Sequence, residues 1–293
     1  MALRYGFHII LNPVAGARRR GLLDDVIRRL RASGASVTVE LTTHAGHATE
    51  LARKAVHSGV DVVVAAGGDG TINEVARGLL GHSVPLGIIP LGTANVLAIE
   101  IGLHPKADDI ADMLLRGPAE LVGTGVVDGE IFLLMAGIGF DGEVVRNINP
   151  RLKCLWGKGS FIWSDLKKWL SGPSYEIDLV VDGRPKKAAW VIATNARHYA
   201  GPFVLAPDES VTRSGLTLFL FRSPSRFSFL VYLAALGLGM VPKLSGVEVL
   251  PARRVEVVSP TGVAVEIDGD ARGFLPLTIE QGVHLLRLVV PPR

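Results

Sequence analysis

Three glycines surround an aspartate in the segment Gly67-Gly68-Asp69-Gly70-Thr71, which has the residue types of a phosphate-binding turn. The apolar run Val60–Ala66 before it predicts a buried strand, and residues Thr71–Leu80 after it predict a helix. Glycines let the backbone turn sharply and leave its N–H groups uncovered. The N-terminus of the following helix adds unpaired donors and partial positive charge, so phosphate groups can bind there.

The carboxylate of Asp69 indicates a cation at this turn. A carboxylate alone would repel a phosphate, whereas Mg²⁺ binds carboxylate and phosphate oxygens together. We therefore expect a nucleoside triphosphate with Mg²⁺, and Asp69 as a metal ligand. A tight strand-to-helix turn with an exposed aspartate is the alternative that this segment alone leaves open.

A second turn, Asn12-Pro13-Val14-Ala15-Gly16, follows the predicted strand Gly6–Leu11. Pro13 fixes the exit of the chain, and Gly16 permits close approach of the backbone. Taken alone, this segment is better explained as an ordinary strand-end turn. The three arginines that follow, residues 18–20, are expected to face solvent.

A third turn, Pro90-Leu91-Gly92-Thr93-Ala94-Asn95, follows the predicted strand Leu86–Ile89. Thr93 can cap the next helix. The functional interpretation adds the hydroxyl of Thr93 and the amide of Asn95 facing the nucleotide, beside Gly92. Because two other strand ends carry glycine turns, we favour the functional interpretation.

Near the end of the chain, Glu266-Ile267-Asp268-Gly269-Asp270 predicts a hairpin turn, since Asp-Gly is a strong turn signal. As chemistry, Asp268 could accept a proton from a substrate hydroxyl. Phosphoryl transfer needs positioning, metal charge and an oriented nucleophile.

The predicted secondary structure that must position these turns changes near Glu120. Before it, strand and helix patterns alternate, which predicts a mostly parallel sheet with helices on both faces and ligands at the carboxyl ends of its strands. After it, short strand patterns follow in series, which predicts an antiparallel sandwich or barrel-like second domain. The later strands are predicted at Leu121–Val127, Glu130–Met135, Glu176–Val181, Ala188–Thr194, Leu216–Phe221, Val247–Leu250, Val255–Val258 and Val263–Ile267. The join is tight, so we expect the two domains to share one cleft.

Composition excludes several classes of function. The 293 residues carry a formal net charge of +3 without a block of five like charges, which argues against a nucleic-acid partner. A single cysteine, Cys154, excludes an internal disulfide and fits a reducing compartment. We see no signal peptide and expect a cytoplasmic protein. The longest apolar stretch, Phe227–Val241, is too short to span a bilayer comfortably, so a core helix is expected there rather than a transmembrane segment.

Two smaller features bear on partners. The segment Trp156–Trp169 combines three tryptophans with lysines, a composition typical of an interfacial helix that docks reversibly on a membrane. A helix packed on the second domain explains it equally well. His44 and His47 are three apart, but no third ligand has matching spacing, so we do not expect zinc.

The ordered set NPVAG, GGDGTINE, PLGTAN and IDGD resembles the diacylglycerol kinase catalytic-domain family, which includes bacterial lipid kinases, sphingosine kinases and ceramide kinases. The likeness runs over nearly the whole chain. GGDGT alone is shared with NAD kinases, whereas its combination with GTAN and a late DGE-like turn is more specific.

The resemblance implies an α/β domain like that of NAD kinase, over residues 1–120 with a C-terminal return of roughly 280–293, and a β-sandwich domain over 121–279. It implies ATP and Mg²⁺ as cofactors and a lipid acceptor at the membrane surface. The family's proton acceptor falls on Asp268, or on Asp270 two positions later. The nucleotide-binding residues expected from the motifs and the resemblance are Asn12, Pro13, Gly16, Thr42, Gly67, Gly68, Asp69, Gly70, Thr71, Asn73, Glu74, Gly92, Thr93 and Asn95.

The chain departs from the family pattern at three positions. Ala15 replaces the serine of the first loop, and Ser214 stands where some members have an aspartate that ligates a structural Mg²⁺. Val96 replaces an aspartate found near the acceptor in many bacterial diacylglycerol kinases, so diacylglycerol and a sphingoid or ceramide lipid both remain open. NAD kinase is a second hypothesis, and a nucleotide-binding lipid sensor without turnover is a third.

Overall fold

The structure, a computed structural model, describes residues 3–16, 19–147, 175–213, 215–223, 225–282 and 286–292. The predicted interfacial segment Trp156–Trp169 and Ser214 lie outside the described residues. The chain divides into two compact units, Met1–Gly123 with Val283–Arg293, and Thr124–Gly282.

The first unit contains a six-stranded sheet with the order β2-β1-β3-β4-β20-β5. Neighbouring strands are parallel from β2 to β20, and only β5 runs antiparallel, at the edge. β3 is buried along its whole length, which explains its continuous apolar sequence, because both faces of a parallel sheet are covered. The strands are β1 Gly6–Leu11, β2 Ser36–Leu41, β3 Val62–Gly67, β4 Leu86–Pro90, β5 Ala119–Val122 and β20 Leu286–Val289.

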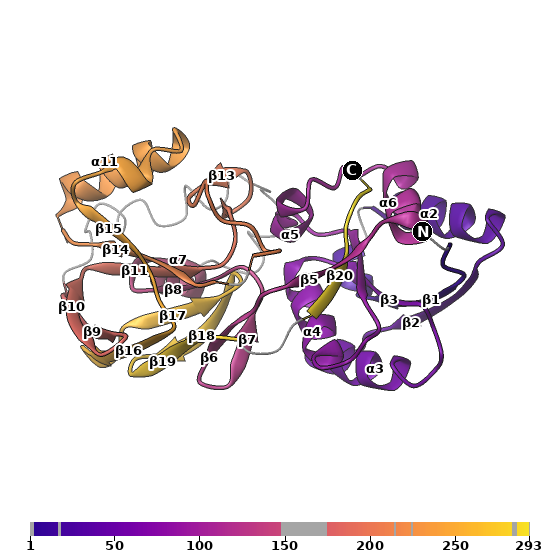
Figure 1. Ribbon diagram of the computed structural model, residues 1–293, viewed down its shortest axis with the longest axis horizontal. Coiled ribbons are helices and arrows are strands. Elements are labelled where there is room, and N and C mark those ends of the chain that lie inside the picture. The colour runs from indigo at the N-terminus through magenta and orange to yellow at the C-terminus, as the bar shows by residue number, and fades with distance from the viewer. Residues whose placement is uncertain are drawn as a thin grey trace. The chain divides into compact units, whose positions relative to one another are not determined.

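Two pairs of helices cover the two faces of this sheet (Figure 1). α2 (Arg20–Ala32) and α6 (Ala107–Arg116) lie on one face, and α3 (His47–Ala55) and α4 (Asp69–Leu79) lie on the other. Leu23, Val26 and Leu30 of α2 are buried at helical spacing. Two short helices, α1 (Pro13–Gly16) and α5 (Val96–Glu100), begin in the loops after β1 and β4. The predicted α/β class of this unit is confirmed.

The second unit is a sandwich of two six-stranded antiparallel sheets with the orders β10-β9-β16-β19-β6-β7 and β15-β14-β11-β8-β17-β18. Alternate residues of both sheets, such as Leu179 of β9 and Val191 of β11, share one core. The predicted sandwich is therefore confirmed. The strands are β6 Gly125–Val127, β7 Glu130–Phe132, β8 Met135–Ile138, β9 Ile177–Val181, β10 Arg184–Ala188, β11 Trp190–Thr194, β14 Thr217–Phe221, β15 Val247–Pro251, β16 Arg254–Ser259, β17 Ala264–Ile267, β18 Asp270–Phe274 and β19 Leu277–Gln281, with a small ribbon of β12 His198–Tyr199 and β13 Phe203–Val204.

The helix α11 (Arg226–Gly237) lies over the outer face of the second sheet (Figure 1). The residues of β11 and β14 that point away from the shared core, such as Trp190 and Phe219, form a second cluster with Tyr232 and Leu236 of α11. The expectation of a core helix over Phe227–Val241 is only half right, because one side of α11 is buried and the other is exposed. α7 (Phe140–Asn147) follows β8, and a short 3₁₀ helix, η2 (Val241–Lys243), follows α11.

Two predicted strands are divided in the structure. Leu121–Val127 becomes β5 and β6, separated at Gly123 and Thr124, and the two halves belong to different units. Glu130–Met135 becomes β7 and the start of β8, because Leu133 and Leu134 leave the ladder. The backbone N–H groups of Leu133 and Leu134 bond to a side chain from β17–β18 instead.

Candidate active site

The carboxyl ends of β1, β2, β3 and β4 lie at one edge of the first sheet, as the strand-end rule predicts. Asn12 N donates to Ala66 O at 3.0 Å, and Leu91 N donates to Gly67 O at 2.9 Å. On the other side of β1, Thr42 N donates to Leu11 O at 2.9 Å. The structure therefore brings the three glycine turns and Thr42 to neighbouring strand ends.

The glycines are required by the close approach of two loops. A Cβ atom on Gly92 would lie 2.5 Å from the Cα atom of Gly68, and one on Gly67 would lie 2.5 Å from Thr71 Oγ1. Gly68 is the N-cap residue of α4 and supplies no side chain to its first turn. The first amide groups of α4 therefore keep the donors that an anion needs.

Asn12 supports the first turn and connects it to the second. Its Oδ1 accepts from Val14 N at 3.1 Å and Ala15 N at 3.3 Å, and its Nδ2 donates to Thr71 Oγ1 at 3.1 Å. The side chain of Asn12 thus holds two loops in register. This is a structural task, and it leaves nucleotide contact at this residue a prediction.

Asp69 is half-buried and faces the start of α5. Its Oδ1 accepts from Leu97 N at 3.4 Å, and burial raises its pKa although backbone N–H groups near Val96 lower it. α5 begins at Val96, three residues later than predicted. The carboxylate of Asp69 therefore accepts from the first turn of this helix, whereas Thr93, the predicted cap, is exposed. The Leu97 N–H contact is long, and a carboxylate that accepts backbone N–H groups can also ligate a cation, so Asp69 keeps the chemistry of a metal ligand.

Asn95 closes the third turn. It has a left-handed backbone with φ 50°, which asparagine tolerates, and its Nδ2 donates to Gly92 O at 2.8 Å. Its Oδ1 is buried and has no hydrogen-bond partner among the described residues. A buried acceptor without a donor is costly in a folded protein, so this oxygen marks a position where a ligand donor would be stabilising.

Two of the expected residues have their side chains directed to other tasks. Asn73 Oδ1 accepts from Arg77 Nε at 2.8 Å, one turn along α4. Glu74 Oε2 accepts from Ala48 N at 3.2 Å, in the first turn of α3. Glu74 therefore caps a neighbouring helix, a contact between segments that no local pattern in the sequence reveals.

Arg19 is a residue that the sequence reasoning missed. It was expected to face solvent, but it is half-buried and its Nη1 donates to Pro90 O at 3.2 Å, at the carboxyl end of β4. Its positive charge therefore lies beside the third turn. Arg20 is exposed, as expected.

The histidine pair has a third potential ligand that was not expected. Ligand atoms of His44, His47 and Glu50 lie within 4.8 Å of one another. However, His47 Nδ1 accepts from Thr43 N at 3.1 Å, so the neutral ring carries its proton on Nε2. That tautomer offers no free nitrogen to a metal, and we assign none to this cluster.

In the second unit, Asp268 and Gly269 form the predicted hairpin turn between β17 and β18. Their φ angles of 49° and 85° are those of the two-residue turn that Asp-Gly favours. The carboxylate of Asp268 accepts three backbone N–H groups, from Leu133 at 2.7 Å, Leu134 at 2.9 Å and Met135 at 3.0 Å. It holds the bend between β7 and β8.

This use of an aspartate recurs in the same unit. Asp128 and Asp182 also have positive φ and precede a glycine. Asp128 accepts from Thr278 N at 2.9 Å, and Asp182 accepts from the backbone of Arg253 at 3.1 Å. Asp268 is thus one of three described Asp-Gly turns whose carboxylate binds a neighbouring segment, which favours a structural role for it.

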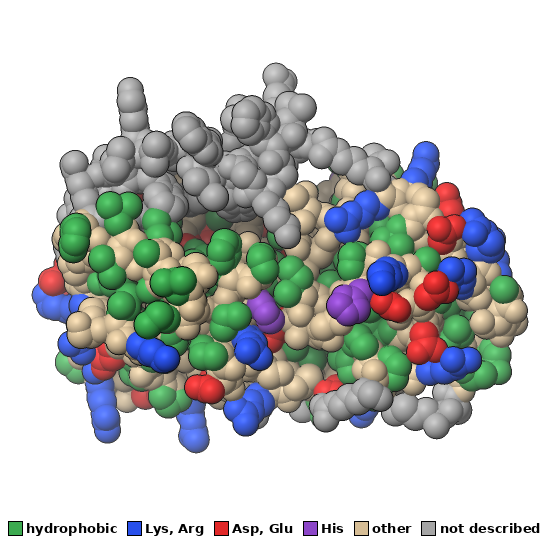
Figure 2. Space-filling model, turned by 90° about the horizontal axis from the view of Figure 1, so that it is seen from above, with side chains coloured by type: hydrophobic (Ala, Val, Ile, Leu, Met, Phe, Trp, Pro, Cys, Tyr) green, Lys and Arg blue, Asp and Glu red, His purple; other side chains and the backbone are tan. Residues whose placement is uncertain are grey.

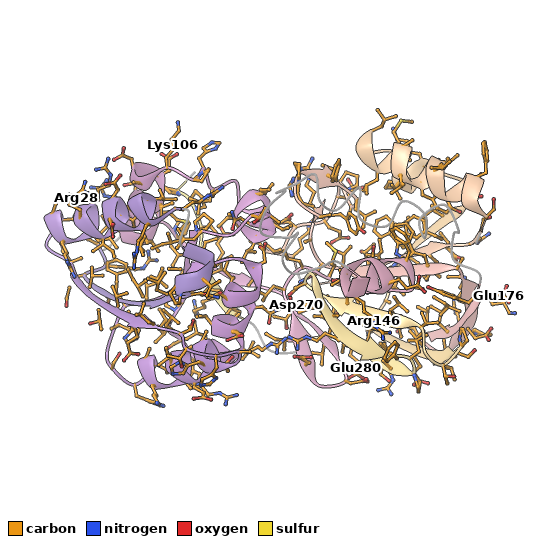
Figure 3. All side chains as sticks on the ribbon, turned by 180° about the vertical axis from the view of Figure 1, so that it is seen from behind. Arg28, Lys106, Arg146, Glu176, Asp270 and Glu280 are labelled. Carbon is orange, nitrogen blue, oxygen red and sulfur yellow. The ribbon has the colours of Figure 1, made fainter. Side chains whose placement is uncertain are left out.

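Asp270 differs from Asp268. It is exposed at the first position of β18 (Figure 3) and accepts no hydrogen bond from the described residues. Of the two predicted proton acceptors, only Asp270 has a carboxylate that backbone donors do not occupy.

A buried acidic pair lies behind this turn, and the sequence reasoning missed it. A Cβ atom on Gly137 would lie 2.5 Å from Asp141 Oδ2 and 2.7 Å from Glu266 Oε1, so the two carboxyl groups flank one point. The hydroxyl of Tyr199 and Trp190 Nε1, the latter at 3.1 Å, donate to Asp141.

Glu266 Oε2 accepts from Gly269 N at 2.7 Å and thereby supports the turn. Burial raises the pKa of Asp141 to about 6, and burial together with the charge of Asp141 raises the pKa of Glu266 well above its usual range. The sequence contained one indication of this buried pair, which is the position of Glu266 inside the apolar run Val263–Ile267.

Comparison with known proteins agrees with this architecture. Residues 6–127 match the family described as the diacylglycerol kinase catalytic domain, and residues 135–290 match the YegS C-terminal NAD kinase beta sandwich-like domain. A protein of Bacillus subtilis strain 168 named diacylglycerol kinase is 29% identical over 291 residues, which is 97% of this chain and 95% of that protein.

Two further similarities extend the comparison. A Chromohalobacter salexigens protein named "Probable lipid kinase YegS-like" is 30% identical over 204 residues, 68% of this chain and 66% of that protein. The crystal structure of a diacylglycerol kinase from Bacillus anthracis str. Sterne has a TM-score of 0.75 at 20% identity, covers 100% of this chain and 98% of that one, and so shares the fold.

The chain belongs to the diacylglycerol kinase catalytic-domain family, and its second unit is the YegS-type C-terminal domain. It is accordingly an enzyme, an ATP-dependent lipid kinase.

Proposed function

We propose that this kinase transfers the γ-phosphate of ATP to a hydroxyl group of a lipid at a membrane surface. The observation that carries the proposal is the convergence of Gly67, Gly68 and Gly92, with uncapped amide groups at the start of α4. Such amide groups bind phosphate oxygens. The buried oxygen of Asn95 and the cation of Arg19 supply further polar contacts beside them.

The donor set fits a single Mg²⁺. Asp69 offers one carboxylate beside the glycine turns, and Mg²⁺ in phosphate-transferring enzymes is bound by one or two carboxylates, the substrate phosphates and water. When bound there, the ion would neutralise charge on the phosphates. We therefore retain Asp69 as the proposed ligand.

We assign the proton acceptor to Asp270 and a positioning role to Asp268. In the proposed reaction, the lipid hydroxyl oxygen bonds to the γ-phosphorus, the bond from this phosphorus to the bridging oxygen of ADP breaks, and the hydroxyl proton passes to the carboxylate of Asp270. The free carboxylate of Asp270 supports this assignment, since the carboxylate of Asp268 already accepts three backbone donors. Asp268 would then fix the turn that presents Asp270.

The acceptor is proposed to be diacylglycerol, as the name of the Bacillus subtilis relative suggests, with a sphingoid or ceramide lipid as the alternative. Incubation of the purified chain with γ-labelled ATP and a total lipid extract, followed by identification of the labelled lipid, tests the proposal. Label on diacylglycerol is expected. Label on NAD in a parallel reaction would identify an NAD kinase, and ATP binding without transfer to any lipid would favour a sensor.

The family's lipid acceptors also imply peripheral association with a membrane, which we propose for this chain. None of the helices among the described residues has both the length and the hydropathy needed to cross a bilayer. The segment Trp156–Trp169, predicted to be interfacial, lies outside those residues.

A further inference from the structure

α11 is apolar on every side. The sequence of Arg226–Gly237, RFSFLVYLAALG, contains one charged residue. Helices that are hydrophobic all round are usually buried or in contact with a membrane. α11 packs through only one side, where Tyr232, Ala235 and Leu236 are buried against the outer face of the second sheet. The opposite side has no covering element among the described residues.

That opposite side and the loop after it form an exposed apolar patch, the α11 surface, made of Phe227, Leu230, Val231, Leu238 and Met240. The exposed fractions are 76% for Phe227, 74% for Leu238 and 51% for Leu230. The spacing of 227, 230, 231 and 238 places these side chains along one stripe. Figure 2 shows hydrophobic side chains gathered on the side of the second unit from which α11 projects in Figure 1.

The segment that carries the α11 surface contains no acidic residue. Residues 222–247 include no aspartate or glutamate, and the basic residues Arg222 and Lys243 flank the helix. Glu248, the next acidic residue, bonds to Lys186 Nζ at 2.6 Å and Arg222 Nη2 at 2.9 Å, so its charge is balanced. Lys243 is exposed three residues after Met240. Exposed apolar side chains beside basic ones complement a bilayer with anionic headgroups.

We propose that the α11 surface is the face with which this kinase docks on an anionic lipid bilayer, with Phe227 and Leu238 entering the acyl boundary and Lys243 contacting headgroups. The proposal rests on the proposed function in one respect, because a lipid acceptor gives the enzyme a reason to meet a bilayer. α11 is too short to span one, so the docking is reversible.

The first test measures binding without catalysis. The full chain is sedimented with phosphatidylcholine vesicles that contain or lack phosphatidylglycerol. The double variant Phe227→Ser/Leu238→Ser is expected to bind the vesicles at least about tenfold more weakly, because serine gains no free energy from moving apolar surface out of water into lipid. Lys243→Glu is expected to weaken binding only to the anionic vesicles, and less so at high salt.

The matched control is Val258→Ser on β16, in the other sheet, where a valine is 53% exposed. It should bind vesicles as the wild type does. Equal vesicle binding by the wild type and the double variant, or the absence of binding by the wild type, would overturn the proposal. Because this test needs no phosphate transfer, it stands even if the lipid acceptor is wrong.

Two further measurements separate docking from other roles of the surface. Transfer to vesicle-embedded diacylglycerol should fall in the double variant in proportion to binding, while transfer to a short-chain, monomeric diacylglycerol should not change. Sedimentation velocity without lipid reports self-association. A wild-type dimer that becomes a monomer in the double variant, with vesicle binding retained, would show that a second copy covers this surface and would contradict our proposal.

Discussion

Leu134 N donates to the carboxylate of Asp268 at 2.9 Å across 134 positions of the sequence, and it thereby ties the bend between β7 and β8 to the hairpin turn between β17 and β18. With the N–H groups of Leu133 and Met135, the carboxylate binds three consecutive residues. The aspartate that the motif predicts to be the base is therefore a connection between strands far apart in the chain.

The first prediction concerns stability. Asp268→Ala should lower the free energy of unfolding by about 2–4 kcal/mol, because three charge-assisted hydrogen bonds are lost. Asp182→Ala is the matched control for the loss of stability, since it removes the same kind of contact between an Asp-Gly carboxylate and backbone N–H groups at another turn. Urea unfolding of both variants measures the effect. Unchanged stability of Asp268→Ala, with turnover lost, would return the role of proton acceptor to Asp268.

The second prediction concerns the proton acceptor. Asp270→Asn should lower turnover by about 10²–10⁴-fold, the usual contribution of a positioned base. Because Asp270 is exposed and bonds to no described donor, the variant should have the same free energy of unfolding and the same affinity for ATP as the wild type. Steady-state kinetics with lipid acceptor and calorimetric titration with ATP check both parts. Wild-type turnover in this variant would remove Asp270 from the reaction.

The third prediction separates the two roles of Asp69. Asp69→Asn keeps an oxygen for Leu97 N but loses the negative charge that a cation requires. Its free energy of unfolding should change by less than about 1 kcal/mol, while turnover at saturating ATP should fall by about 10²-fold or more. A titration with Mg²⁺ measures the ion requirement. The same dependence on Mg²⁺ in variant and wild type would place the ion elsewhere.

The fourth prediction uses the buried pair Asp141 and Glu266. Both folded-state pKa values are raised, so the folded chain binds more protons than the unfolded chain between pH 4 and pH 6. The stabilising effect of these protons is present at low pH and is lost as pH rises through about 6 for Asp141.

Glu266→Gln can still accept from Gly269 N and can donate to Asp141, without a buried charge. It should therefore be more stable than the wild type at pH 8, by on the order of 2 kcal/mol, and the difference should shrink at pH 5. Urea unfolding at the two pH values measures it. An equal decline of wild type and variant with pH would show that the pair does not share its protons in this way.

Sequence reasoning predicted the part of the site that depends on strand order. Gly67, Gly92 and Asn12 follow predicted strands of one parallel sheet, and the carboxyl ends of such strands must meet at one edge. The hairpin at Asp268 was predictable because the preference of Asp-Gly for this turn is local.

The remaining features depend on contacts between distant segments. Glu74 caps the helix that starts after His47, Asp69 serves the first turn of α5, and Arg19 reaches a carbonyl of β4. A single sequence reports the type of each residue and not its partner. The same reasoning explains the predicted strand Leu121–Val127, whose apolar pattern continues although its two halves join different sheets.

The position of β20 sets an order of events during synthesis. Leu288 of β20 pairs with Leu86 of β4 on one side and with Glu120 of β5 on the other. A ribosome makes β4 and β5 long before β20, and all of Thr124–Gly282 emerges in between. Until β20 arrives, the edge of β4 offers unpaired backbone groups, so the sheet of the first unit cannot close before the whole of the second unit has been translated.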